Sequence, residues 1–144
     1  MNGTGANAFN PNADTTRSMI VTILARMEGV NTSGGETWYT AGREWAMENG
    51  ISDGTNMEGK ITREQLAAML YRYAKMKGYD VSASASLSGY TDASGVSGWA
   101  KEAMQWAVAS GLIQGSNNAL TPQANASRAQ IATILMRFAQ SIAK

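Results

Sequence analysis

Apolar residues recur at helical spacing in three segments that each begin with an arginine. Counted from Arg17, Arg63 and Arg128, the positions three, six, seven and ten residues further on are all apolar or aromatic. This spacing places those side chains on one face of an amphipathic helix. We therefore predict helices over residues 15–28, 62–77 and 127–142.

Two other segments each carry a pair of tryptophans seven residues apart, so that both rings lie on the same helix face. The pairs are Trp38 with Trp45 and Trp99 with Trp106, at an offset of 61 residues. Each segment leads to a glycine of the kind that ends a helix. We predict helices over residues 38–49 and 99–110, and hence an all-α fold.

The connections between these helices repeat as well. Phe9-Asn10-Pro11 and Leu120-Thr121-Pro122 begin eight residues before Arg17 and Arg128. In this register the chain opens just after a first tryptophan-bearing helix would have ended, so we expect the first repeat to be incomplete. The predicted organisation is the C-terminal half of repeat 1 (1–30), repeat 2 (31–78), a connector rich in Ser, Gly and Ala (79–98) and repeat 3 (99–144).

Taken together, the Trp-Ala helix, the glycine stop, the Phe/Leu-x-Pro loop and the Thr/Ser-Arg helix start resemble the S-layer homology domain. The likeness covers nearly the whole chain. The chain most resembles the tandem repeats of this family in Gram-positive gut or clostridial bacteria. It implies helix–loop–helix repeats in a pseudo-threefold arrangement around a central helix bundle. It also implies grooves between the repeats that bind a secondary cell-wall polymer of peptidoglycan, often through a pyruvylated sugar.

The same resemblance implies a non-covalent anchoring module that is extracellular and associated with the cell wall or S-layer, with its signal peptide outside this chain. Asp92, in Tyr90-Thr91-Asp92 of the third repeat, joins the candidate ligand-binding residues on this ground. The chain departs from the family where a glutamate is usual, because Met19, Gln65 and Gln130 stand there.

The three leading arginines carry a second argument that is independent of the family. Each occupies the first helical position, where the helix dipole is positive and a cation is disfavoured. Free backbone N–H groups together with a guanidinium suit a carboxylate or phosphate, so Arg17, Arg63 and Arg128 are candidate anion-binding residues. The alternative is that each pairs with a neighbouring Asp or Glu. The Thr/Ser-x-x-Gln pattern around them indicates capping boxes.

A second arginine column, Arg26, Arg72 and Arg137, lies nine residues further along the same helices. Nine residues turn about half-way round a helix, so the two columns cannot share a site on their own helix. We expect capping or inter-repeat pairing for this column, with lining of an adjacent groove as the alternative.

Aromatic rings and glycines supply the remaining candidates. Trp45 and Trp106 are predicted core residues, whereas Trp38 and Trp99 begin their helices and either stack on a sugar or pack internally. Gly54 and Gly115 give either the backbone freedom of a helix end or close approach of a ligand.

Composition excludes several classes of function. The formal net charge is +1 and there is no cysteine or histidine, so we expect no nucleic-acid partner, no metal site, no cofactor and no catalytic residue. No apolar stretch is long enough for a membrane span. The alternative function is a protein–protein interaction module with the same fold, including self-association through the face left by the missing first helix.

Overall fold

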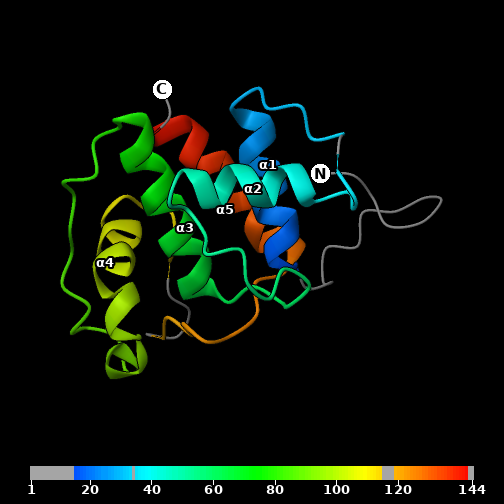
Figure 1. Cartoon of the computed structure of the whole chain (residues 1–144). Coiled ribbons are helices and arrows are strands. Elements are labelled where there is room, and N and C mark those ends of the chain that lie inside the picture. The colour runs from blue at the N-terminus through cyan, green and yellow to red at the C-terminus, as the bar shows by residue number, and fades with distance from the viewer. Residues whose placement is uncertain (1–14, 34, 115–118, 143–144) are drawn as a thin grey trace.

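The computed structural model describes residues 15–33, 35–114 and 119–142, and within them the chain is helical (Figure 1). The α-helices are α1 (Arg17–Met27), α2 (Thr40–Glu48), α3 (Arg63–Lys77), α4 (Lys101–Ala109) and α5 (Arg128–Ser141). Two short 3₁₀ turns, η1 (Ala93–Gly95) and η2 (Gly98–Ala100), precede α4. The described residues contain no strand beyond two isolated bridges. The predicted all-α fold is confirmed.

Side-chain caps explain why α1, α3 and α5 begin where they do. The hydroxyls of Thr16, Thr62 and Ser127 each accept a hydrogen bond from the backbone N–H three residues further on. At α3 and α5 the glutamine at that third position also accepts from the N–H of the cap, which completes the predicted capping boxes. Since Met19 replaces this glutamine in α1, its cap is one-sided.

The apolar faces meet in a single core. The helix α1 packs against α2, and α3 packs against α4 (Figure 1). Ring contacts of Phe138 with Tyr73 and Tyr79 bring α5 against the end of α3. Trp106 is 1% exposed, and the partly buried Trp45 packs on Tyr73 at 6.0 Å between ring centroids. Both tryptophans therefore pack inside the protein, as expected.

A closed ring of backbone hydrogen bonds ties the starts of α1, α3 and α5 together. Ile61 N–H donates to the Thr15 carbonyl (2.8 Å), Ala126 N–H to Ile61 (2.9 Å), and Thr15 N–H to Ala126 (3.2 Å). Each of these residues stands one position before a capping residue, so the ring sets the three helix starts side by side. Such a ring is compatible with a threefold arrangement of the helix starts. The pseudo-threefold arrangement of complete repeats stays a prediction.

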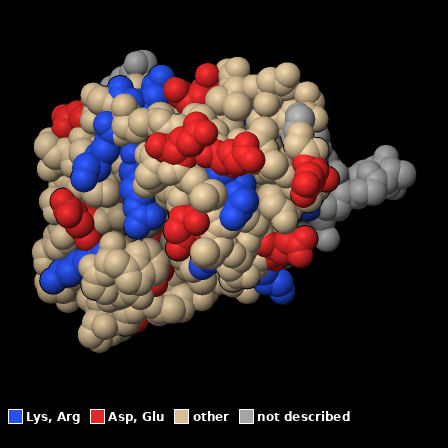
Figure 2. Space-filling model, viewed as in Figure 1, with Lys and Arg blue, Asp and Glu red and all other residues tan. Residues whose placement is uncertain are grey.

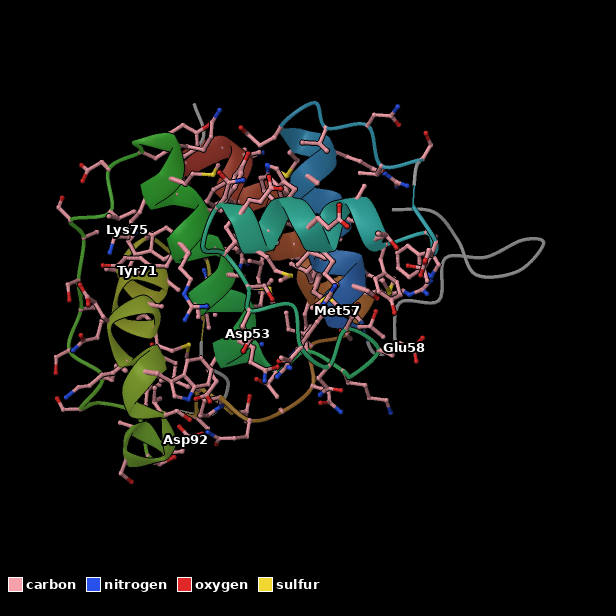
Figure 3. All side chains as sticks on the ribbon, viewed as in Figure 1. Asp53, Met57, Glu58, Tyr71, Lys75 and Asp92 are labelled. Atoms are coloured by element: carbon pink, nitrogen blue, oxygen red, sulfur yellow. The ribbon has the colours of Figure 1, made fainter. Side chains whose placement is uncertain are left out.

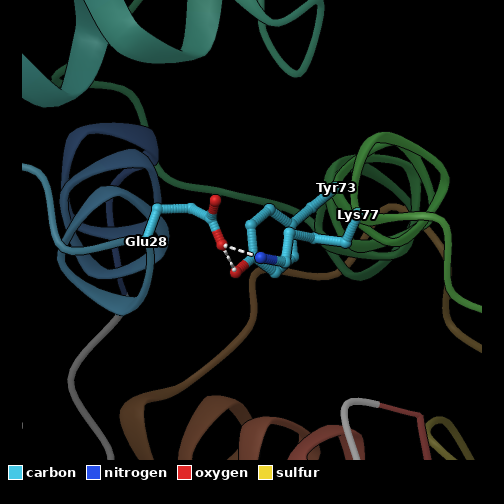
Figure 4. A network of polar contacts seen from close by, with 3 residues as sticks. All are labelled: Glu28, Tyr73 and Lys77. Carbon is cyan, nitrogen blue, oxygen red and sulfur yellow. Dashed lines mark hydrogen bonds and ion pairs between the residues drawn. The ribbon is translucent and has the colours of Figure 1, made fainter.

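A polar network joins α1 to α3 at their other ends (Figure 4). Glu28 caps α1 and accepts from the Tyr73 hydroxyl at 2.8 Å and from Lys77 at 2.9 Å. The hydrogen bond from Lys77, with a further one from Tyr73, holds the pKa of Glu28 below its ordinary value. The pKa of Tyr73 is raised by burial and by its bond to this carboxylate. The network fixes the spacing of the two helices at the end away from the ring.

Candidate functional site

Two grooves lie beside the starts of α1 and α3. Groove 1, with a cavity volume of about 280 Å³, is lined by Arg17, Ser52, Asp53, Gln65, Ala68, Met69, Arg72 and Trp99. Groove 2, of about 410 Å³, is lined by Arg63, Leu112, Ile113, Gln114, Ala119, Thr121, Ala129, Gln130, Thr133, Ile134 and Arg137. Asp53 and Asp92 both lie on loops toward the end of the molecule where α3 begins (Figure 3).

The two grooves are equivalent in the repeat. Groove 1 combines the start of α1, the loop after α2 and one face of α3. Groove 2 combines the start of α3, the loop after α4 and one face of α5. Each groove therefore lies between one repeat and the next, where the resemblance implied it. The repeat boundaries themselves stay a prediction.

The two arginine columns meet in these grooves. Arg17 begins α1 and Arg72 lies late in α3, yet both line groove 1. Arg63 and Arg137 make the same pair in groove 2. On any one helix the two arginine columns lie on opposite faces. They meet because the first-column arginine of one helix faces the second-column arginine of the next. Arg26 lines neither groove, and its Nε donates to the hydroxyl of Thr32 at 2.9 Å.

Backbone carbonyls hold the second-column arginines of the grooves at the ends of α2 and α4. Arg72 Nη1 donates to the Ile51 carbonyl at 3.2 Å, and Arg137 Nη1 to the Leu112 carbonyl at 3.5 Å. Both carbonyls follow the glycine that ends the preceding helix: Gly50, with φ of 70°, and Gly111, with φ of 75°. Each of these contacts lies within one predicted repeat, 31–78 for Arg72 and 99–144 for Arg137, so neither is the expected inter-repeat pairing. Both arginines do line a groove, which was the alternative.

The leading arginines differ in their surroundings. Arg63 is 8% exposed, and it donates from Nε to the Leu120 carbonyl at 2.9 Å and from Nη2 to the Gln114 carbonyl at 3.3 Å. Burial lowers the pKa of Arg63, against a raising effect of Asp92. Arg17 makes one longer contact, from Nη1 to the Thr55 carbonyl at 3.5 Å.

Arg128 is 9% exposed, and its Nε and Nη1 have no hydrogen-bond partner among the described residues. In the repeat alignment the counterpart of Thr55 and Leu120 is Phe9, which lies outside those residues. Where the described residues supply a partner to a leading arginine, the bonded atom is a backbone carbonyl and not a carboxylate. Their role in ligand binding stays a prediction.

Two aspartates hold the loops that carry these carbonyls. Asp92 accepts the N–H groups of Leu120 and Thr121, each at 2.8 Å, and these bonds, the one from Leu120 foremost, lower the pKa of Asp92. Asp53 accepts the hydroxyl of Thr55 at 2.7 Å and its N–H at 3.0 Å, and the same residue lowers the pKa of Asp53.

The geometry thus gives Asp92 a bracing contact across two loops, and its predicted contact with ligand stays untested. Thr121, at a φ of 47°, occupies a backbone region that a β-branched residue rarely adopts, and it lines groove 2. Strain of this kind persists where surrounding contacts enforce it, often at functional sites.

The exposed tryptophans stand just before their α-helices and not inside them. Trp99 lies in η2, is 56% exposed and lines groove 1, so its ring is available to a ligand there. Trp38 is equally exposed but lines neither groove, and its ring meets Tyr39 edge-on at 5.3 Å. The stacking role of both stays a prediction.

Gly54 has a φ of +78° and is buried. A side chain there would collide with Met47 and press on Arg43, whose Nε donates to the Gly54 carbonyl at 2.8 Å. The close approach at this glycine is therefore made by the protein's own side chains. Gly115, the counterpart in the next repeat, lies outside the described residues.

Sequence reasoning missed several groove residues. Asp53, Gln65 and Met69 line groove 1, and their repeat counterparts Gln114, Gln130 and Ile134 line groove 2. The signal was present, because the glycine stops and the capping boxes repeat at fixed offsets. The capping boxes predicted from the sequence give the two glutamines one role, whereas in the structure each both caps a helix and lines a groove.

Three other kinds of site find no support in the part of the chain that is described. Its Asp and Glu residues form no group of three or more that could hold a metal ion. None of its helices combines the length and apolarity that crossing a bilayer demands. On the viewed face, basic and acidic side chains are interspersed (Figure 2), so no single-sign patch for nucleic acid is present there.

Several known proteins are similar to the chain. Residues 89–132 match the family model of the S-layer homology domain. The chain is 30% identical over 154 residues to an endoglucanase of a Bacillus species, covering 98% of the chain and 16% of that relative. It is 26% identical over 146 residues to a surface-layer 125 kDa protein of Lysinibacillus sphaericus, covering 93% of the chain and 12% of the relative. The chain thus spans less than a fifth of these relatives.

Among solved structures, an undecaheme cytochrome from the S-layer of Carboxydothermus ferrireducens matches with a TM-score of 0.57 at 23% identity. The match covers 94% of this chain and 19% of that one. It shows a shared helical fold across nearly the whole chain. The resemblance inferred from the repeats is confirmed over residues 89–132, which match the S-layer homology domain.

Proposed function

We propose that this chain anchors its protein to the cell surface without a covalent bond, by binding secondary cell-wall polysaccharide in grooves 1 and 2. The observation that carries the proposal is the repeated pair of arginines, one from each of two neighbouring helices, in each groove. Guanidinium groups from two directions suit an acidic substituent such as the carboxylate of a pyruvylated sugar. The similarity to a surface-layer protein supports the same proposal.

Two grooves on one chain also suit a polymeric ligand. A repeating polysaccharide presents the same group many times, so binding at one groove raises the local concentration of ligand at the other. Modest affinity at each groove then gives durable attachment of the whole protein. Attachment of this kind needs no catalytic residue, because the chain acts only by binding the polysaccharide.

The test is co-sedimentation with purified Gram-positive cell walls, before and after removal of the non-peptidoglycan polymer. We expect binding to intact walls and little binding to stripped walls. Equal binding to stripped walls would contradict the proposal. If the chain binds proteins of the cell wall and not the polymer, the alternative, a protein–protein interaction module, is favoured.

Replacement of the groove 1 arginines sharpens this test. The double variant Arg17→Gln, Arg72→Gln removes both guanidinium groups and their hydrogen-bond donors from groove 1, and a loss of wall binding of at least about tenfold is expected. Arg26→Gln is the matched control, since Arg26 lines neither groove. Self-association of the chain is checked separately, by light scattering of the same samples.

A further inference from the structure

The two grooves differ at one charged position. Asp53 lines groove 1 between the start of α1 and the face of α3, whereas its repeat counterpart in groove 2 is Gln114. Groove 1 therefore holds two arginines and a carboxylate. Groove 2 holds two arginines, and none of its described lining residues is acidic.

The Asp53 carboxylate of groove 1 is charged at neutral pH and already lies near a positive charge. Hydrogen bonds from Thr55 hold the pKa of Asp53 below its ordinary value, and the positive charge of Arg17 acts in the same direction. An anionic ligand in groove 1 would have to approach this carboxylate to reach Arg17. Like charges in one site repel each other, so groove 1 disfavours anions relative to groove 2.

Groove 2 keeps donors available for an anion. Arg63 donates from Nε and Nη2 to two carbonyls. Since a guanidinium has five N–H donors, others remain for a ligand. Arg137 makes one contact, at 3.5 Å. Asp92 also acts on Arg63 electrostatically, yet both its oxygens accept backbone N–H groups, and it is absent from the lining of the groove.

Groove 1 has an exposed aromatic ring, whereas groove 2 has the more favourable charge for an anion. Trp99 lines groove 1 and is 56% exposed, which offers a flat apolar surface to the face of a sugar ring. No aromatic side chain is among the described residues that line groove 2. The Asp53 carboxylate adds an acceptor and the Gln65 amide adds an N–H donor, and both suit the hydroxyl groups of a neutral sugar.

We infer that the two grooves take different parts of one polysaccharide. Groove 2 binds a sugar that carries a carboxylate, through Arg63 and Arg137, and groove 1 binds a neutral sugar stacked on Trp99 with its hydroxyls on Asp53. This inference rests on the proposed function and adds the ligand class of each groove. An acidic sugar next to a neutral one along the polymer would then set the register of the chain on its ligand.

The experiment is an NMR titration of the isotopically labelled chain with two probes. One probe is a pyruvylated oligosaccharide released from a secondary cell-wall polymer, and the other is the same compound with its carboxyl groups methyl-esterified. Amide signals of Ser52 and Asp53 report on groove 1, and those of Ile113 and Gln114 report on groove 2. Loss of the ligand's charge should weaken groove 2 about tenfold and change groove 1 less than about threefold.

An exchange of the differing residues provides the matched variants. Asp53→Asn should tighten groove 1 for the acidic probe, and Gln114→Asp should weaken groove 2 for it, each by about three- to tenfold. The amide spectra without ligand verify that both variants fold. Equal preference of both grooves for the acidic probe, or no change on the exchange, would overturn the inference and leave the proposed function standing. No shift in either groove with either probe would instead overturn both.

Discussion

The starts of α1 and α3 carry the same Thr-Arg motif in different surroundings. In residues 62–64 the arginine and the following Glu64 are both buried, and their side chains together bond four residues from the last third of the chain. In residues 16–18 the arginine side chain makes one hydrogen bond, at 3.5 Å, and the side chain of the following Ser18 bonds to Thr16. One motif thus starts two helices that are held with different firmness.

The difference comes from the loop that each helix start meets. The loop at the start of α3 is braced by Asp92, from a segment 28 residues away in the chain, and by Glu64, which reaches Gln123 and Ser97. The loop at the start of α1 is held by nearby residues: Asp53 bonds Thr55 two positions on, and Arg43 of α2 bonds the Gly54 carbonyl. Local motifs set where these helices begin, whereas long-range contacts set how rigid each groove wall is.

The largest effect is expected from Glu64→Ala. The carboxylate is 4% exposed and accepts from the Ser97 N–H (3.0 Å), the Ser97 hydroxyl (2.6 Å) and the Gln123 amide (3.2 Å). Its removal leaves these donors without their acceptor, and we expect unfolding free energy to fall by about 3 kcal/mol in urea denaturation.

Ser18→Ala is the control at the equivalent position of α1. Ser18 is buried but bonds locally to the Thr16 hydroxyl, so about 1 kcal/mol or less is expected. Equal losses for the two variants would mean that the starts do not differ in the way the contacts indicate.

The sequence alone predicts the features that depend on residues close together in the chain. The five helices and the two capping boxes followed from spacing and cap residues, since those interactions span three or four positions. The convergence of Arg17 with Arg72 could not be derived, because it depends on how two helices pack. The segment 79–98, expected as a connector, carries η1 and the start of η2, and Ser97 within it bonds to Glu64.

Acidification should separate the two aspartates. The pKa of each is lowered in the folded state, so the stability that each contributes is present above the ordinary aspartate pKa of about 3.9 and is lost as pH falls through the folded value. Asp92 bonds across the fold, whereas the turn at Asp53 is local and can persist in the unfolded chain. Asp92 should therefore account for more of the acid sensitivity.

The measurement is the urea midpoint of wild type, Asp92→Asn and Asp53→Asn between pH 3 and pH 7. We expect a deficit for Asp92→Asn at pH 7 that is smaller than the loss from Glu64→Ala and shrinks toward pH 3. Asp53→Asn should stay near wild type throughout. The reverse order would show that the loop held by nearby residues, and not the braced one, limits stability.

The smallest effect is expected from giving α1 the cap of α3. In α3 the Gln65 side chain accepts from the Thr62 N–H at 2.9 Å, and in α1 the same position is the partly buried Met19. Met19→Gln should complete a capping box and raise the unfolding free energy by about 0.5 kcal/mol, while Gln65→Met should lower it by a similar amount. Both are read from thermal and urea unfolding. If Met19→Gln is destabilising instead, the apolar contact of Met19 outweighs a second cap bond, and the two starts then differ by packing as well as by their loops.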